Sequence, residues 1–340
     1  MSDAPPSILS LRGLSVWFQV GARLFGKAKS LHAVESVDLE VRPGEALGIV
    51  GESGCGKSTL ARAVLQLVRP THGSVVWLGR AIEGLSVSDL RPLRRDMQIV
   101  FQDPLASLDP RMTVGEIVAE PLRVHCPELD RAARREEVAG MLERVGLSRD
   151  VINRYPHEFS GGQCQRIGIA RAMILKPKLL ICDEPVSALD VSIQAQIINL
   201  LKGLQRDFGM TVLFVSHNLA VVRRMCDRVL VLYLGRTMEL AATDALYSKP
   251  LHPYTRGLLA AVPVPDPDIQ PGRLGATLAG ELPSPLAPPS GCVFRTRCAH
   301  AIARCSEEIP TFEVLPPTVA GGVERHIACH RWREIDPQES

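Results

Sequence analysis

One stretch of the chain decides its fold: Gly51-Glu52-Ser53-Gly54-Cys55-Gly56-Lys57-Ser58-Thr59. It fits the phosphate-binding pattern G-x-x-x-x-G-K-[ST]. The apolar run at 46–50 before it is typical of a buried strand, and residues 60–67 after it are typical of a helix. The glycines allow backbone N–H groups to turn toward phosphate oxygens, and the helix N-terminus adds positive potential. The sequence therefore predicts a site for a nucleoside triphosphate.

Individual residues of this loop have predicted roles. We expect Lys57 to reach the β- and γ-phosphates and the Ser58 hydroxyl to bind Mg²⁺. The other loop residues predicted to contact the nucleotide are Gly51, Ser53, Gly54, Cys55, Gly56 and Thr59.

The composition is that of an ordinary globular protein. Of 340 residues, 46% are hydrophobic and 22% are charged, and the formal net charge is +2. A charge this close to zero, with only 4% aromatic residues, gives no reason to expect nucleic acid as a partner. No apolar run approaches the ~18–20 residues that span a bilayer, and residues 1–7 lack the features of a signal peptide. We therefore expect a cytosolic chain that docks, if anywhere, onto a membrane protein.

Strand-like and helix-like segments alternate along most of the chain, which predicts an α/β fold with a mostly parallel sheet core. The early runs at 8–16 and 31–41 are expected to form an antiparallel β flap, joined by a loop or hairpin tip at 21–30. Further strands are predicted at 45–50, 75–78, 97–101, 178–183, 211–216 and 229–234. Helices are predicted at 58–68, 113–122, 131–145, 162–175, 191–207 and 219–225.

The composition changes near residue 250. Eleven of the 26 prolines fall between 263 and 317, and Pro263, Pro265 and Pro267 are spaced like an extended linker. We therefore place a nucleotide-binding domain at residues 1–255 and a Pro-rich linker with a small Cys-rich domain at 256–340. Because no internal repeat is visible, we expect one nucleotide-binding domain.

A second phosphate-site element ends in two acidic residues: Lys178-Leu179-Leu180-Ile181-Cys182-Asp183-Glu184. An apolar strand ending in Asp fits a Walker B element, with Asp183 holding Mg²⁺. Glu184 can polarise the attacking water, and a positioned base typically contributes about 10²–10⁴-fold to a rate. An acidic pair at a strand end is by itself usually a solvated terminus. The phosphate loop upstream favours the catalytic interpretation.

A short motif, Ser160-Gly161-Gly162-Gln163, precedes a predicted helix. In isolation it is an ordinary N-cap. Lying between a phosphate loop and a Walker B strand, it resembles the signature of the ATP-binding-cassette (ABC) family. The resemblance implies an ABC nucleotide-binding domain of P-loop NTPase type, with a helical subdomain at about 103–175. It also implies that two such domains meet head to tail, each signature capping the γ-phosphate of ATP held by the other. The unpaired N–H groups at a helix start suit such an anion site.

The remaining elements of the family follow in order. Gln102 resembles the Q-loop glutamine, which senses Mg²⁺ and water and links to the membrane subunit. Asp190, in Ser187-Ala188-Leu189-Asp190, resembles the D-loop residue, and His217 resembles the switch histidine at the γ-phosphate. For the aromatic ring that stacks on adenine we predict Phe18, with Trp17 as its rival. The resemblance thus implies a catalytic set of Glu184, His217 and Gln102, and Mg²⁺ ligands Ser58, Gln102 and Asp183.

Three further stretches, at 102–113, 184–196 and 251–255, resemble the ATPase subunits of oligopeptide and dipeptide importers. The pattern at 184–196 is closer to the F-type of the paired D and F subunits, and the resemblance covers about residues 8–335. It implies ATP-driven closure of a heterodimer with a D-type homologue, coupled to two membrane permease subunits and an extracytoplasmic solute-binding protein. The chain would then be a peripheral subunit on the cytoplasmic face of the inner (plasma) membrane.

Two other functions stay open at this point. A nickel or other small-solute importer would use the same ATPase motifs, because cargo is chosen by the binding protein and the membrane subunits. A soluble ABC ATPase acting on ribosomes or DNA fits less well, since such members carry two cassettes in one chain or long coiled-coil insertions.

Three residues depart from the family pattern. Phe159 replaces the usual Leu, Cys164 stands where Arg or Lys is usual, and Asn218 follows His217 where Asp is usual. None of these changes removes a group that performs the chemistry. Cys164 and Asn218 are the candidates for weakened coupling or for unequal activity of the two composite sites.

Four of the nine cysteines lie in the last fifth of the chain: Cys292, Cys298, Cys305 and Cys329. Their spacing is wider than the C-x2–4-C pairs of structural zinc sites, and four thiolates suit an iron–sulfur cluster at least as well. Importer subunits with a similar tail carry a [4Fe–4S] cluster, so the resemblance implies one here, chiefly as a structural staple. Zinc and unligated thiols stay open as alternatives. The candidates for a mixed site are His300, His326 and His330.

Overall fold

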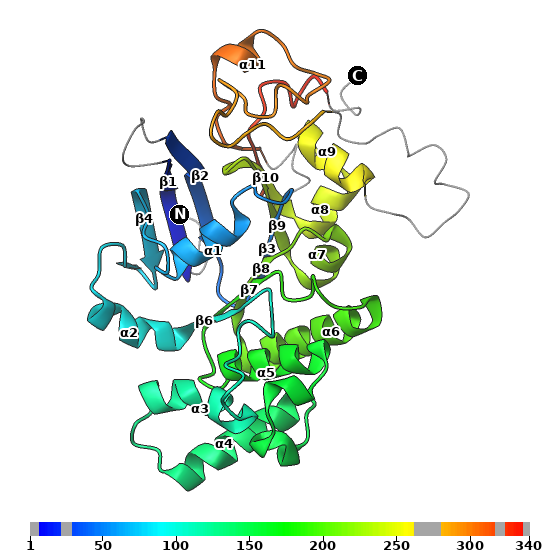
Figure 1. Ribbon diagram of the computed structural model, residues 1–340. Helices are drawn as coiled ribbons and strands as arrows, with labels where there is room; N and C mark the ends of the chain where they lie inside the picture. Colours follow the sequence, from blue (N-terminus) through cyan, green and yellow to red (C-terminus); the bar gives the residue numbers. More distant parts are fainter. Residues whose placement is uncertain (1–6, 22–28, 262–279, 317–323, 336–340) are drawn as a thin grey trace. The chain divides into compact units, whose positions relative to one another are not determined.

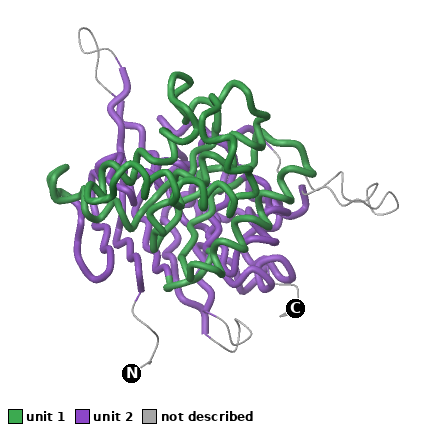
Figure 2. Tube along the Cα trace, turned by 90° about the horizontal axis from the view of Figure 1, so that it is seen from below, with its two compact units in different colours: residues 1–6, 42–46, 84–216 green, residues 7–41, 47–83, 217–340 purple. Residues whose placement is uncertain are grey.

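The structure is a computed structural model that describes residues 7–21, 29–261, 280–316 and 324–335 (Figure 1). The chain divides into two compact units, which Figure 2 distinguishes by colour. Unit 1 contains residues 42–46 and 84–216, and unit 2 contains residues 7–41, 47–83 and 217–340. Most of the predicted hairpin tip at 21–30 and the linker prolines Pro263, Pro265 and Pro267 lie outside the described residues.

Unit 1 is built on three parallel strands. β6 (Met97–Val100), β7 (Leu179–Asp183) and β8 (Thr211–Val215) pair in the order β8-β7-β6. All residues of β7 and β8 are buried, which explains their unbroken apolar sequences. Helix α2 (Val87–Asp96) leads into β6, and α6 (Val191–Phe208) connects β7 to β8.

Three more helices of unit 1 pack on one another (Figure 1): α3 (Val114–His125), α4 (Arg131–Arg144) and α5 (Gly161–Met173). Each begins at a side-chain cap: Thr113 on α3, Asp130 on α4 and Ser160 on α5. Short 3-10 turns, η1 (Arg149–Asn153) and η2 (Pro156–Glu158), lead from α4 to α5. The helices predicted in this region are confirmed, with small shifts at their ends.

Unit 2 contains the predicted antiparallel flap. β1 (Leu9–Val20), β2 (Lys29–Val41), β4 (His72–Trp77) and β5 (Arg80–Ala81) form a sheet in the order β2-β1-β4-β5, and every pair is antiparallel. Figure 1 shows β1, β2 and β4 side by side.

A second group of strands in unit 2 carries the phosphate loop. The order is β11-β12-β10-β9-β3, with β3 (Ala46–Val50) parallel to β9 (Arg228–Tyr233). β10 (Arg236–Ala242), β12 (His326–Ile327) and β11 (Glu313–Val314) continue it with antiparallel pairs. The described part of unit 2 contains the helices α1 (Lys57–Val64), α7 (Leu219–Met225), α8 (Thr243–Ser248), α9 (Pro253–Ala260) and α11 (Arg304–Glu307).

The C-terminal strands therefore extend the same strand group as β3. The division of the chain at 255/256, and the helical subdomain at about 103–175, stay predictions. Among the described residues, no helix is both long enough and apolar enough to cross a bilayer.

Candidate nucleotide-binding site

The phosphate loop connects β3 to α1 and lies tightly against its neighbours. A Cβ atom at Gly51 would lie 2.2 Å from the Leu232 carbonyl oxygen, and one at Gly56 would lie 2.1 Å from the Ala33 carbonyl oxygen. Gly56 is the N-cap of α1 and has a φ of 103°, a conformation that favours glycine. The backbone N–H of Gly235 donates to the Cys55 carbonyl at 2.8 Å. The two glycines are thus required by the packing of the loop on β2 and β9.

Lys57 is held inside this loop. Its side chain is buried, and its Nζ donates to the carbonyl oxygens of Gly51 at 2.8 Å and Glu52 at 2.9 Å. The neighbouring Cys55 thiol is also buried, and burial raises its pKa. The loop therefore carries a fixed ammonium group beside a thiol that stays protonated.

The acidic pair lies in unit 1, at the end of β7. The Asp183 side chain is buried. The next residue, Glu184, has a left-handed backbone conformation with a φ of 48°. Such a conformation costs a non-glycine residue about 1–2 kcal/mol. Hydrogen bonds around the peptide hold it: Glu184 N donates to Val215 O at 3.0 Å, and Ser187 Oγ donates to Glu184 O at 3.1 Å. The left-handed backbone of Glu184 points its side chain in a direction that a regular strand would not give.

Gln102 lies beside this carboxylate. Its Nε2 donates to Glu184 Oε2 at 3.3 Å. The structure thus brings together two of the three predicted catalytic residues. The third, His217, is exposed and lies before α7 in unit 2.

The signature motif opens α5 on the surface of unit 1. Ser160 and Gln163 form a capping box: Gln163 N donates to Ser160 Oγ at 3.4 Å, and Ser160 N donates to Gln163 Oε1 at 3.0 Å. A Cβ atom at Gly162 would lie 2.6 Å from Ile193 Cγ2 of α6. The cap and this close packing leave Ser160, Gly161 and Gln163 exposed.

Asp190 stands at the N-cap position of α6. It is exposed, and its carboxylate makes no cap hydrogen bond with that helix. An exposed carboxylate with this placement is accessible to another chain.

The two aromatic candidates for adenine stacking have different surroundings. The Trp17 ring stacks on the His32 ring with centroids 4.2 Å apart, and its Nε1 donates to Glu35 Oε2 at 2.7 Å. The Phe18 side chain is 38% exposed. Because one face of the Trp17 ring is covered, Phe18 stays the better prediction.

The three departures from the family pattern each fit their surroundings. The guanidinium of Arg154 lies over the Phe159 ring, 4.8 Å from its centroid. The Cys164 thiol is buried and donates to the Pro156 carbonyl at 3.4 Å. Asn218 Oδ1 caps α7 by accepting from Ala220 N at 3.1 Å, as an aspartate would. The cap of α7 is therefore preserved without the charge.

The four C-terminal cysteines line one small cavity of about 20 Å³ in unit 2. Burial, with a smaller contribution from charge on the neighbouring thiols, raises the pKa of Cys292 to about 11 and that of Cys329 to about 12. His252, His300 and His330 also line this cavity. His326 is not among the described lining residues, and its Nε2 lies 2.9 Å from Glu324 Oε1.

The described residues contain no group of three or more His, Cys, Asp or Glu side chains that could hold a metal ion. The [4Fe–4S] cluster implied by the resemblance is therefore without support from this arrangement. Four thiols around one cavity are nevertheless the donor set that such a cluster uses.

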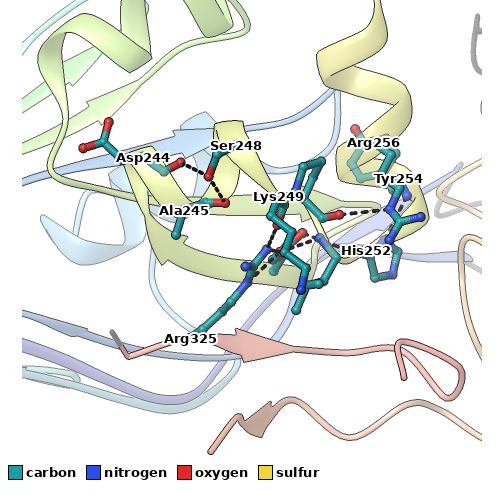
Figure 3. Close-up of polar contacts among 11 residues, drawn as sticks. Asp244, Ala245, Ser248, Lys249, His252, Tyr254, Arg256 and Arg325 are labelled. Atoms are coloured by element: carbon teal, nitrogen blue, oxygen red, sulfur yellow. Dashed lines mark hydrogen bonds and ion pairs between the residues drawn. The ribbon is translucent and has the colours of Figure 1, made fainter. Parts of the chain in front are cut away.

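A buried ion pair fixes the C-terminal tail to β10. Arg325 Nε donates to Glu239 Oε1 at 3.1 Å, and the two side chains are 4% and 0% exposed. Arg325 also donates to the Lys249 carbonyl, as Figure 3 shows. Glu239 accepts from the backbone N–H of His252 at 3.0 Å. Sequence reasoning missed both charged residues, because they lie 86 positions apart and no local pattern pairs them.

His252 lies fully buried at the start of α9. Its Nδ1 accepts from Tyr254 N at 3.0 Å (Figure 3), and burial lowers its pKa to about 4. The imidazole is therefore neutral at physiological pH and acts as a helix cap. The sequence shows residues 251–255 only as a stretch that resembles peptide-importer ATPases, and it does not predict the capping role of His252.

Comparison with known proteins gives the same assignment as the motifs. Residues 34–187 match the family described as "ABC transporter", and residues 238–305 match "Oligopeptide/dipeptide transporter, C-terminal region". The oligopeptide transport ATP-binding protein OppF of Escherichia coli (strain K12) is 57% identical over 97% of this chain and 97% of its own length. OppF of Haemophilus influenzae is 53% identical over 92% of this chain and 95% of its own. The chain belongs to the oligopeptide-transport family of ABC ATPases.

Solved structures confirm the predicted fold of this ABC ATPase. A post-hydrolysis dimer of the ATP-binding cassette MJ0796, bound to ADP and Pi, is similar with a TM-score of 0.63 and 30% identity. It covers 69% of this chain and 98% of its own. CbiO1 of Clostridium perfringens has a TM-score of 0.61 and 27% identity, and covers 72% of this chain and 92% of its own. The chain is accordingly an ATP-hydrolysing enzyme for which ATP and Mg²⁺ are expected.

Proposed function

We propose that this ABC ATPase energises the import of di- and oligopeptides as the F-type subunit of a membrane transporter. The observation that carries the proposal is the 57% identity to an oligopeptide transport ATP-binding protein over nearly the full length of both chains. The match of residues 238–305 to the C-terminal region of oligopeptide and dipeptide transporters supports the same cargo. The proposed domains are an ABC domain at 1–255 and a linker with a Cys-rich domain at 256–340.

In the proposed mechanism, Glu184 is the general base. Its carboxylate accepts a proton from the attacking water as the water oxygen bonds to the γ-phosphorus and the bond to the bridging oxygen of ADP breaks. Gln102, 3.3 Å from this carboxylate, orients the base and the water. His217 contacts the γ-phosphate. Lys57 offsets the phosphate charge.

The other site residues bind and orient the nucleotide. Phe18 stacks on adenine, and Ser58, Gln102 and Asp183 would hold Mg²⁺. The phosphates are cradled by Gly51, Ser53, Gly54, Cys55, Gly56 and Thr59. Ser160, Gly161, Gln163 and Asp190, which are exposed, together with the half-buried Gly162, serve the nucleotide of a second ATPase subunit.

The proposed partners follow from the need for a second subunit to complete each nucleotide site. A D-type homologue supplies the second signature, two permease subunits form the membrane path, and an extracytoplasmic solute-binding protein delivers the peptide. The chain would work as a peripheral subunit on the cytoplasmic face of the membrane. A site completed by a second subunit makes ATP hydrolysis dependent on assembly.

We further propose that Cys292, Cys298, Cys305 and Cys329 hold a [4Fe–4S] cluster. When bound, the cluster supplies four iron–thiolate bonds that tie the tail together. The donor set supports it, because all four thiols line one cavity, and iron would offset the burial that raises the pKa of Cys292 and Cys329. Anaerobic purification should give a brown protein with iron and sulfide in equal amounts. A colourless protein with stoichiometric zinc would eliminate the cluster.

The cargo is tested by assembling the chain with its permeases, its ATPase partner and the solute-binding protein. We expect ATP turnover to be stimulated by binding protein loaded with an oligopeptide. Stimulation by Ni²⁺-loaded binding protein, with none by peptide, would instead identify the small-solute alternative. Failure of the chain to associate with any permease would contradict both importers.

A further inference from the structure

Glu52 occupies a variable position of the phosphate loop, yet its side chain is tied to the C-terminal segment. Arg297 Nη1 lies 2.6 Å from Glu52 Oε2, and Arg297 Nη2 lies 3.1 Å from Glu52 Oε1. This is the two-pronged geometry that a guanidinium makes with a carboxylate. The Arg297 side chain is 5% exposed and that of Glu52 is 27% exposed. The pair is therefore screened less by water than an ordinary surface ion pair.

The backbone of Glu52 is held as well. Its N–H donates to the Tyr254 hydroxyl at 2.9 Å, and Tyr254 is fully buried. The Tyr254 ring lies 4.7 Å from the Tyr233 ring and 5.3 Å from the Phe294 ring, measured between centroids. The packing of these aromatic rings fixes the position of the hydroxyl.

The same segment links the loop to the cysteine cavity. Phe294 and Cys298 both line that cavity, and Arg297 directly precedes Cys298. The guanidinium of Arg297 also lies 3.5 Å from the Tyr233 hydroxyl. Glu52 is thus held by a side chain from 245 residues further along the chain, at a point next to the cavity.

We propose that Arg297 and Tyr254 are positioning residues that set the affinity of the phosphate loop for ATP. Neither touches the reacting atoms. They fix both the side chain and the N–H of Glu52, whose carbonyl oxygen in turn accepts from Lys57 at 2.9 Å. Losing either contact lets the loop sample conformations that do not bind phosphate, so nucleotide affinity falls. The proposal rests on nucleotide binding by the loop and not on the identity of the cargo.

The test is the dissociation constant of a fluorescent ATP analogue with Mg²⁺, measured on the full chain. For Arg297→Gln we expect binding weaker by roughly 3- to 30-fold, since a charged hydrogen-bonded pair is lost. Tyr254→Phe removes one neutral acceptor, and we expect a loss of roughly 2- to 10-fold. The matched control is Arg295→Gln in the same segment, whose guanidinium instead donates to the Ser290 carbonyl at 2.9 Å. It should stay within about two-fold of the wild type.

A double-mutant cycle separates positioning from a general effect on folding. In a Glu52→Gln background, Arg297→Gln should weaken ATP binding much less, because the carboxylate that pairs with Arg297 is already gone. In the assembled transporter, Arg297→Gln should raise the KM for ATP and leave kcat nearly unchanged. Wild-type affinity in a folded Arg297→Gln protein, or an equal loss in both backgrounds, would overturn the proposal. If Arg297→Gln does not fold, Arg297→Lys keeps the charge and should show a smaller loss.

Failure of this proposal is distinguishable from failure of the proposed function. A chain that binds ATP but imports no peptide leaves the affinity test intact. If substitution of Arg297 does not change the affinity for ATP, the proposed import function is unaffected.

Discussion

Gly56 shows at the residue scale how closely the phosphate loop is packed. Its φ is 103°, and a Cβ atom there would lie 2.1 Å from the Ala33 carbonyl oxygen. We expect Gly56→Ala to displace the backbone of the loop and to weaken ATP binding by more than about ten-fold, because both the space and the φ angle exclude a side chain. Equilibrium binding of an ATP analogue measures this.

The control for this substitution is Gly79→Ala. Gly79 also has a positive φ, of 79°, but nothing lies within 4 Å of the added Cβ. It should cost about 1 kcal/mol of stability through backbone strain and leave ATP binding unchanged. Equal losses of ATP binding in the two variants would show that strain alone, and not contact with β2, explains the requirement at Gly56.

Some of these residue-scale features could be read from the sequence and others could not. The pattern of the phosphate loop predicts which glycines turn the backbone, because it has a known geometric requirement. The left-handed backbone of Glu184 could not be predicted, since it depends on hydrogen bonds to Val215 and Ser187. The contact between Glu52 and Arg297 joins residues 245 apart, and no local pattern encodes it.

At the scale of elements, a buried ion pair joins β10 to the C-terminal tail, and its removal tests how the tail is held. Glu239 and Arg325 are 0% and 4% exposed. Arg325→Met would leave the Glu239 carboxylate buried without its cation, and breaking such a pair costs about 3–5 kcal/mol. Urea unfolding of the wild type and the variant measures the loss.

An exposed pair in the same tail provides the comparison. Arg304 lies 2.7 Å from Glu308 across one helical turn, and both side chains are more than half exposed. Arg304→Met should therefore cost no more than about 0.5 kcal/mol. If Arg325→Met is equally mild, the Glu239–Arg325 pair does not hold the tail to β10.

Elements with a clear hydrophobic period were predicted well, and those with interrupted patterns were missed. β7 and β8 are unbroken apolar runs and were predicted nearly to the residue. β10 was missed because the buried Glu239 interrupts its apolar run. α2 was missed because it is polar and contains Pro92. In both cases the tertiary partners, and not the local sequence, decide the structure.

At the scale of the whole molecule, the residues with proposed roles in ATP hydrolysis are distributed over two compact units. The phosphate loop and His217 belong to unit 2, whereas Gln102, Asp183, Glu184 and the signature belong to unit 1. The family membership predicted from the motifs is confirmed by the comparisons, because the ABC motifs have fixed spacing and order. The cargo could not be derived from the ATPase motifs, since they contact nucleotide and not peptide.

The central claim is that ATP hydrolysis by this chain energises peptide import. Its most direct test is ATP-driven uptake of a labelled oligopeptide into proteoliposomes that contain the assembled transporter, with either wild-type chain or Glu184→Gln. We predict that the variant still binds ATP, that turnover at this base falls by about 10²–10⁴-fold, and that uptake loses most of its rate. Uptake at the wild-type rate with Glu184→Gln, or ATP hydrolysis by the wild type with no uptake of peptide, would contradict the account.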